Sequence, residues 1–202
     1  PEDCESAWGA LGPAPDGLVL EAFVPFDREV SLIGVRAREG QTAFYPLVEN
    51  LHKDGIRDQT LAPAQDVTAD LQSAAEQMAA EAMKRLDYVG ILTIEFFQVG
   101  GELFVNEMAP RVHNSGHWTI EGACTSQFAN HIRAVCGQSL GSTALRGPSH
   151  MFNLVGSMPA RERVESLAGA YFHDYGKVAK PKRKLGHITL NHPTGLPTAE
   201  LT

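Results

Sequence analysis

Two glutamates lie in consecutive apolar stretches whose composition is typical of β-strands. Glu95 lies in ILTIEFF and Glu107 lies in ELFVNEM, with the pair Gly100-Gly101 between the two stretches. A carboxylate on the buried face of a strand is costly unless a positive group lies beside it. The pattern therefore predicts a β-hairpin whose two carboxylates hold a cation.

The register of this hairpin decides whether the two carboxylates meet, because side chains alternate between the faces of a strand. A two-residue glycine loop would pair Glu95 with Asn106 and send Glu107 to the other face. A three-residue loop from Gly100 to Glu102 pairs Glu95 with Glu107, and this is the register that we predict. Two carboxylates about 5 Å apart repel by about 3 kcal/mol at an effective dielectric of about 20, so they require a compensating cation.

Magnesium suits such a pair, because it takes one or two carboxylates and completes its shell with water and phosphate oxygens. The hairpin is therefore interpreted as a metal-nucleotide site. The alternative is that one of the two glutamates simply points to solvent from a half-exposed sheet.

A loop rich in polar side chains follows the second strand. Pro110 prevents the strand from continuing, and Arg111, His113 and Asn114 offer a cation, a titratable ring and an amide. Such a set suits a small planar anion, because arginine donates in pairs to carboxylate-like oxygens. The alternative is a polar loop that caps a helix beginning at Thr119.

Composition narrows the class of function. The 202 residues carry a net charge of -7 and are 43% hydrophobic, which favours a soluble protein that acts on small molecules and argues against nucleic-acid or anionic-membrane binding. We find no apolar run long enough to span a membrane and no leader peptide, so the cytoplasm is the expected location. Cys4, Cys124 and Cys136 have neither disulfide-framework nor zinc-site spacing.

Periodicity predicts an α+β fold. Apolar residues at Val67, Leu71, Ala75, Met78, Ala82 and Leu86 predict a helix over residues 66–86, which precedes the antiparallel hairpin. Further helices are expected over residues 2–11 and 120–135, with strands over 18–24, within 29–52, and over 149–158, 170–176 and 186–191. We expect two units, residues 1–140 and a small C-terminal β subdomain over residues 141–202.

The run NEMAPRVHNSGHWT resembles the metal and substrate segment of the ATP-grasp ligases. More narrowly, it resembles that of the 5-(carboxyamino)imidazole ribonucleotide synthases of purine biosynthesis. This resemblance implies a partial ATP-grasp fold, with ATP and Mg²⁺ as cofactors. It also implies ATP-dependent carboxylation of aminoimidazole ribonucleotide by bicarbonate, through carboxyphosphate. Ala109 stands where other branches of the superfamily carry an asparagine, which removes one expected metal ligand.

The resemblance also assigns roles to individual residues of this sequence. Glu95 and Glu107 would hold the magnesium ion, and Arg111, His113 and Asn114 would position bicarbonate or carboxyphosphate. The nucleotide would contact the backbone of a hinge segment, the ribose-binding Glu29, and further side chains of the sheet; these positions are Glu21, Ala22, Phe23, Val24, Glu29, His52, Asn106 and Glu107.

The segment YGKVAKPKRKLGH resembles the family's phosphate-binding segment for the ribonucleotide. Carried over by position, it implies substrate contacts from Lys177, Arg183 and Lys184. Lys180 and Lys182 depart from the family pattern, where an arginine and a glycine stand.

The chain begins at Pro1 without a methionine, and we expect it to be a C-terminal fragment that turns over ATP poorly by itself. Family analogy suggests a homodimer. Two kinds of alternative remain. The first is another ATP-grasp enzyme, such as a formate-dependent glycinamide ribonucleotide transformylase or a biotin-dependent carboxylase subunit. The second is a non-catalytic nucleotide-binding module.

Overall fold

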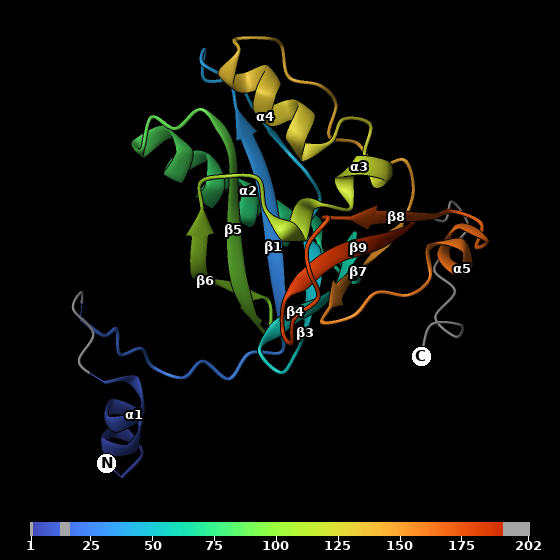
Figure 1. Cartoon of the computed structure of the whole chain (residues 1–202). Helices are drawn as coiled ribbons and strands as arrows, with labels where there is room; N and C mark the ends of the chain where they lie inside the picture. The colour runs from blue at the N-terminus through green and yellow to red at the C-terminus, as the bar shows by residue number, and fades with distance from the viewer. Residues whose placement is uncertain (1, 13–16, 192–202) are drawn as a thin grey trace.

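A nine-stranded sheet with antiparallel pairing runs through the protein (Figure 1). The computed structural model describes residues 2–12 and 17–191. The strand order is β6-β5-β1-β3-β4-β7-β9-β8, with β2 paired to β1. The strands are β1 (Arg28–Arg36), β2 (Thr42–Phe44), β3 (Val48–Lys53), β4 (Ile56–Ala62), β5 (Gly90–Val99), β6 (Glu102–Ala109), β7 (Ser149–Val155), β8 (Ala170–Asp174) and β9 (Lys184–Asn191).

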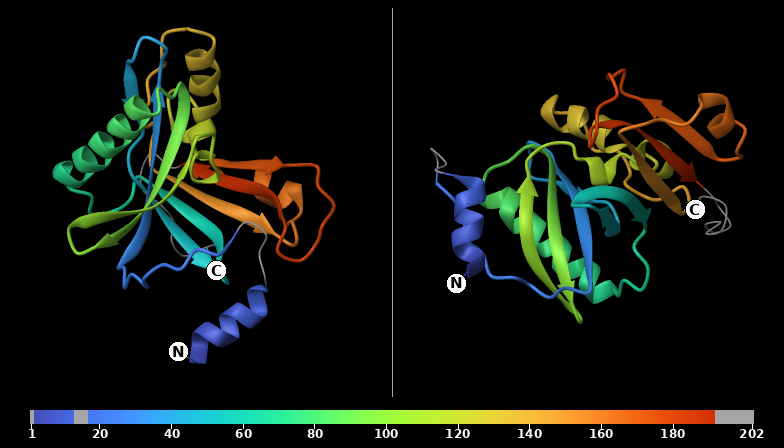
Figure 2. Two further views of the ribbon diagram at one scale, coloured as in Figure 1. Left: turned by 90° about the vertical axis from the view of Figure 1, so that its left-hand side faces the viewer. Right: turned by 60° about the horizontal axis from the view of Figure 1, so that its bottom comes forward.

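Two helices cover opposite faces of this sheet, as the left view of Figure 2 shows for α2 and α4. Alternation along β1 explains the two layers, because Val30 and Leu32 pack in the core beside α2 whereas Ile33 and Val35 pack beside α4. The helices are α1 (Glu2–Leu11), α2 (Ala69–Arg85), the 3₁₀ helix η1 (Asn114–Gly116), α3 (Thr119–Gly122), α4 (Gln127–Val135) and α5 (Arg161–Glu165).

Helix α2 confirms the predicted amphipathic helix, and of the predicted apolar residues Leu71 and Ala75 are in the core while Val67 and Ala82 pack against it. Thr68 caps its first turn by accepting a hydrogen bond from the Leu71 N–H, and the buried residues are Leu71, Ala75, Ala79 and Met83. Met78, which we expected in the core, is 37% exposed. The buried stripe therefore includes Ala79 and Met83, which the predicted stripe omitted, and leaves out Met78.

The predicted strand over residues 18–24 is wrong, because this segment is extended without a sheet partner among the described residues. Phe23 is 88% exposed. The segment reaches the sheet only at its end, where the Asp27 N–H donates to the Gln98 carbonyl and Phe26 stacks on Phe97. It joins α1, which lies away from the sheet in Figure 1.

Two further elements differ from expectation. The predicted helix over residues 120–135 is divided into α3 and α4, because Ser126 caps a new helix by accepting from the Ala129 N–H. Strand β4 was not predicted, and it proves central because it joins β3 to β7.

The C-terminal strands continue the same sheet. Strand β7 pairs with β4 over residues 149–152, and β9 lies between β7 and β8. The division into two units near residue 140 therefore stays a prediction. None of the helices within residues 2–12 and 17–191 has the length and apolarity needed to cross a membrane.

Candidate functional site

The central hairpin pairs Glu95 with Glu107, as predicted, but by a different route. The loop contains only the two glycines, since Val99 pairs with Glu102, and the predicted three-residue loop is wrong. A β-bulge at Asn106 inserts one extra residue opposite the Glu95–Phe96 step and restores the pairing of the two glutamates. Loop and bulge together place both carboxylates on one face.

The site forms where one face of the sheet changes from apolar to polar. On β1, Ile33 and Val35 lie in the core beside α4, whereas Glu29 and Ser31 continue the same face beyond it. On β5, Ile91 is in the same core, whereas Glu95 pairs with Ser31 across the ladder. The carboxylate side chains of Glu29 and Glu95 therefore lie on this face just beyond the part that packs beside α4.

This polar part of the face lines a cavity of about 490 Å³. It brings together most of the side chains that the sequence assigned to the nucleotide and the metal, along with Lys184 from β9. The lining residues are Glu29, His52, Gly55, Ile56, Arg57, Glu95, Asn106, Glu107, His113 and Lys184.

Glu95 is buried and has two nitrogen partners. Its Oε2 accepts from Arg57 Nη2 at 2.7 Å, and its Oε1 lies 3.1 Å from His113 Nε2. The Arg57 side chain is only 6% exposed. The protein thus supplies its own cation to the carboxylate for which a metal was predicted, whereas Glu107 is exposed.

The surroundings of His113 fix its tautomer. The Ser115 N–H can only donate, and it donates to His113 Nδ1, so the ring proton lies on Nε2, the nitrogen that is 3.1 Å from Glu95 Oε1. Burial, together with the nearby Arg57 cation, lowers the pKa of His113 to about 4. His113 is therefore a neutral ring beside Glu95 at pH 7.

Glu29 and His52 form a second pair on the neighbouring strands β1 and β3. His52 Nδ1 lies 2.5 Å from Glu29 Oε2, and both side chains line the cavity. Burial lowers the pKa of His52, while the Glu29 carboxylate partly opposes that effect. The two residues assigned to the nucleotide are thus held side by side.

Asn114 ties the polar loop to the C-terminal strands. Its amide exchanges two hydrogen bonds with the amide of Asn153 on β7, at 2.7 and 2.9 Å, and its Oδ1 also accepts from Lys184 Nζ at 3.2 Å. Burial, together with the Arg57 cation, lowers the pKa of Lys184 to about 8. Asn114 therefore positions Lys184 at the edge of the cavity.

Other predicted site residues do not line this cavity. Arg111 is exposed and donates to the carbonyl of the adjacent Val112. Lys177 and Arg183 lie exposed in the β8–β9 connection, where Lys177 Nζ is 5.3 Å from the centre of the Tyr175 ring. The hinge residues Glu21, Ala22, Phe23 and Val24 lie on the extended segment before β1.

Sequence reasoning missed Arg57 and Asn153. A buried glutamate requires a cation, but nothing in the sequence selects Arg57 among 17 basic residues. The selection comes from the β3–β4 register, which pairs Arg57 with His52 beside the cavity. Asn153 holds that strand in place, since its Nδ2 donates to the Arg57 carbonyl as well as to Asn114.

The donor set fits a magnesium ion that arrives with phosphate groups. Glu95 and Glu107 supply carboxylates on one face, and magnesium completes its shell with water and phosphate oxygens. Within residues 2–12 and 17–191, no group of three potential His, Cys, Asp or Glu ligands could hold a metal ion. The two carboxylates are thus suited to a shared metal-nucleotide site rather than to an isolated metal site.

Comparison with known proteins places this geometry in a family. The family model for the ATP-grasp domain matches residues 1–128, and that for the phosphoribosylaminoimidazole carboxylase C-terminal domain matches residues 149–198. The N5-carboxyaminoimidazole ribonucleotide synthase of Pseudomonas aeruginosa is 52% identical over 190 residues, covering 94% of this chain and 51% of that protein.

Solved structures agree. The N5-carboxyaminoimidazole ribonucleotide synthetase of Thermus thermophilus is 60% identical, with a TM-score of 0.91. The Aspergillus clavatus N5-carboxyaminoimidazole synthase in complex with ADP and 5-aminoimidazole ribonucleotide is 35% identical, with a TM-score of 0.88. Each comparison covers 95% of this chain and 53% of the other, so the chain spans about half the length of its relatives. With the fold, the paired glutamates and the matched residues in agreement, this chain belongs to the ATP-grasp family.

Proposed function

We propose that this chain supplies the metal-nucleotide site, and part of the substrate site, of an ATP-dependent carbon–nitrogen ligase. The reaction is the carboxylation of aminoimidazole ribonucleotide by bicarbonate through carboxyphosphate, giving 5-(carboxyamino)imidazole ribonucleotide, ADP and phosphate. The supporting observation is the single cavity in which Glu29, His52, Asn106, Glu107 and Glu95 meet. The names of the relatives supply the substrate class.

The residues of the cavity would have two roles, namely binding the metal ion and the anions, and positioning the side chains that do so. When bound, magnesium would neutralise the charge of the phosphate oxygens, and Glu95 and Glu107 would hold it. Arg57 fixes the Glu95 carboxylate by a hydrogen bond to Oε2, and His113 Nε2 lies 3.1 Å from Oε1. Asn114 and Asn153 fix Lys184, whose ammonium faces the same cavity and would attract the anionic carboxyl donor or the ribonucleotide phosphate.

Arg111, Lys177 and Arg183 stay proposed anion contacts. All three are exposed cations on segments that flank the cavity residues His113 and Lys184. The hinge over Glu21–Val24 stays a proposed adenine contact through its backbone. Homodimer assembly and a cytoplasmic location stay predictions from family analogy and composition.

Calorimetric titration of the chain with Mg-ADP tests the nucleotide site. Replacing Glu107 by Gln should abolish the magnesium-dependent part of binding, because one of the two carboxylate ligands is lost. Glu102→Gln is the matched control, since Glu102 is an exposed glutamate of the same strand that lies outside the cavity lining. Equal binding by both variants and the unmodified chain would contradict the proposal and favour a non-catalytic module.

The substrate needs a separate experiment on the longer protein to which the chain corresponds. Bicarbonate should stimulate release of ADP in the presence of aminoimidazole ribonucleotide, and formate should not. Stimulation by formate alone would instead support the transformylase alternative.

A further inference from the structure

Each oxygen of the Glu95 carboxylate already has a nitrogen of the protein beside it. Arg57 Nη2 donates to Oε2 at 2.7 Å, and His113 Nε2 lies 3.1 Å from Oε1. Both neighbouring side chains are buried along with the carboxylate. Of the two, Arg57 carries the permanent positive charge, because a guanidinium stays protonated in proteins.

Arg57 therefore occupies the electrostatic position that a divalent cation would take. A metal approaching Glu95 would meet a guanidinium at hydrogen-bond distance from the oxygen it needs, and like charges at such distances repel strongly. Glu107 lies directly across the ladder, exposed, and it takes part in no ion pair within the described residues. The Glu107 carboxylate is thus available to a divalent cation, whereas the Glu95 carboxylate is paired with Arg57.

The Arg57 guanidinium also has a hydrogen-bond donor that is not used. Arg57 Nε is buried without a hydrogen-bond partner among the described residues, although a guanidinium has five N–H donors. A buried donor without an acceptor is costly. Because Arg57 lines the cavity, an anion that enters there would meet a cation with a donor to spare.

We propose that Arg57 makes divalent-cation binding at Glu95 depend on an anionic ligand. Without the anion, Arg57 competes with the cation for the carboxylate. Phosphate oxygens of a nucleotide in the cavity draw the guanidinium toward themselves and release Glu95 Oε2 for the metal. The proposal rests on the proposed function for the identity of the anion, whereas the competition at Glu95 rests on the hydrogen bonds alone.

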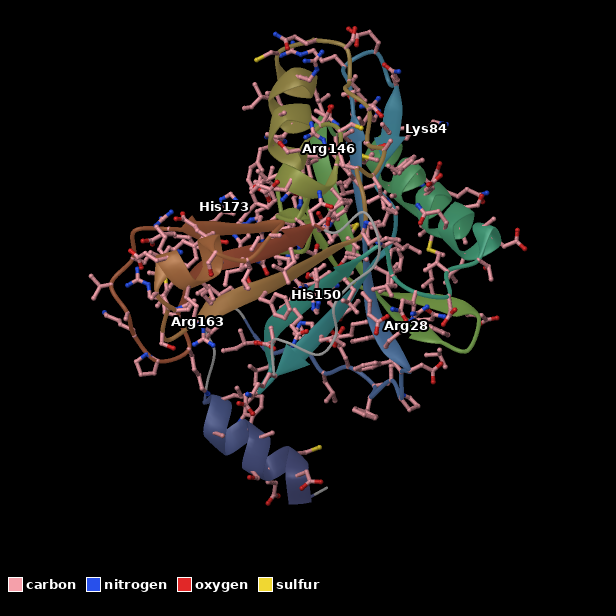
Figure 3. All side chains as sticks on the ribbon, turned by 90° about the vertical axis from the view of Figure 1, so that its right-hand side faces the viewer. Arg28, Lys84, Arg146, His150, Arg163 and His173 are labelled. Carbon is pink, nitrogen blue, oxygen red and sulfur yellow. The ribbon has the colours of Figure 1, made fainter. Side chains whose placement is uncertain are left out.

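Manganese binding to the chain without nucleotide tests the competition, with the electron paramagnetic resonance signal of free Mn²⁺ as the readout. Arg57→Gln should bind Mn²⁺ at least tenfold more tightly than the unmodified chain, because the competing charge is gone while an amide still donates to Glu95. Arg28→Gln is the matched control and should leave Mn²⁺ binding unchanged. Arg28 also pairs with a glutamate, Glu49, but it is the first residue of β1 (labelled in Figure 3) and does not line the cavity. Equal Mn²⁺ affinity of Arg57→Gln and the unmodified chain would overturn the proposal.

Circular dichroism checks that each variant is folded. If Arg57→Gln is not folded, Arg57→Lys decides the matter, because it keeps a cation on a shorter side chain that reaches Glu95 less closely. It should bind Mn²⁺ about threefold more tightly than the unmodified chain, and no gain would overturn the proposal.

Added ADP tests whether an anionic ligand relieves the competition between Arg57 and the metal ion. ADP should increase the Mn²⁺ affinity of the unmodified chain by a factor about ten times larger than that of the Arg57→Gln variant, since the variant has no competitor to remove. The Mn-ADP complex in solution is common to both and cancels in the ratio. Equal factors would overturn the proposal, whereas a failure of the proposed function is seen separately, as unchanged Mg-ADP binding by Glu107→Gln.

Discussion

Replacing each of the two paired glutamates by glutamine should have very different effects on folding. Glu95→Gln leaves the Arg57 guanidinium buried without its counter-charge, whereas Glu107→Gln alters an exposed side chain. Unit charges about 4 Å apart interact by about 4 kcal/mol at an effective dielectric of about 20. Breaking a buried ion pair by removing one partner costs about 3 to 5 kcal/mol. We therefore expect a loss of that size for Glu95→Gln and a change below about 0.5 kcal/mol for Glu107→Gln.

Urea unfolding followed by tryptophan fluorescence measures the difference. Trp118 is fully buried and lies just after the loop that carries His113, so its emission reports on this region, and circular dichroism reports on the whole chain. With a slope of about 2 kcal/mol per molar urea, the midpoint of Glu95→Gln should fall by about 2 M. The double variant Arg57→Met with Glu95→Gln should recover most of the loss, because no unpaired charge remains. Equal midpoints for the two single variants would refute the buried ion pair.

Three other predictions follow from the geometry. Competitive acetylation across pH, read by mass spectrometry, should give Lys184 a midpoint near 8, the value to which burial lowers its pKa, and a midpoint near the value of about 10.4 of a free lysine would contradict this burial. Unfolding free energy should fall as the pH drops from about 6.5 toward 4, because burial lowers the pKa of His117 to about 4 and the unfolded chain then binds more protons. Urea unfolding at a series of pH values measures this slope, and His117→Gln should reduce it, whereas an unchanged slope would contradict the burial of that ring. Gly186→Ala should cost about 3 kcal/mol in urea unfolding, since its Cβ would lie 2.2 Å from the His173 carbonyl oxygen, whereas Gly101→Ala, with open space around it, should be close to neutral.

The sequence correctly predicted that Glu95 pairs with Glu107, but it predicted the wrong loop length. A regular hairpin with a two-residue loop would pair Glu95 with Asn106. Because side chains alternate with period two, one extra residue is needed in the loop or in a strand before Glu95 and Glu107 can lie opposite each other on one face. We placed the extra residue in the loop, and the structure places it in a bulge at Asn106. The period of two follows from the backbone geometry of any strand, whereas the position of the extra residue depends on local hydrogen bonding that the sequence does not specify.

The strand expected over residues 18–24 shows a similar limit. Its apolar residues have the composition of a strand, but a strand forms only where another backbone offers hydrogen bonds. Within the described residues the sheet accepts this segment only at Asp27 and Phe26. Local pattern predicts the tendency to extend, and tertiary pairing decides whether a sheet forms.

The cation beside Glu95 shows why a buried carboxylate is an ambiguous sign of a metal. The energetic requirement is only that a positive group compensates the charge, and a guanidinium satisfies it as well as a metal ion does. Strand register decides between the two, because β3–β4 pairing brings Arg57 to the cavity from a position that is close to Glu95 only in the folded sheet. The exposed Glu107 carries the more specific information. It has no cation beside it in the described residues, yet it faces the same cavity as Glu95 across the ladder. Under the proposed function the pair would hold an external cation, and under the proposal for Arg57 an anionic ligand would displace the internal one.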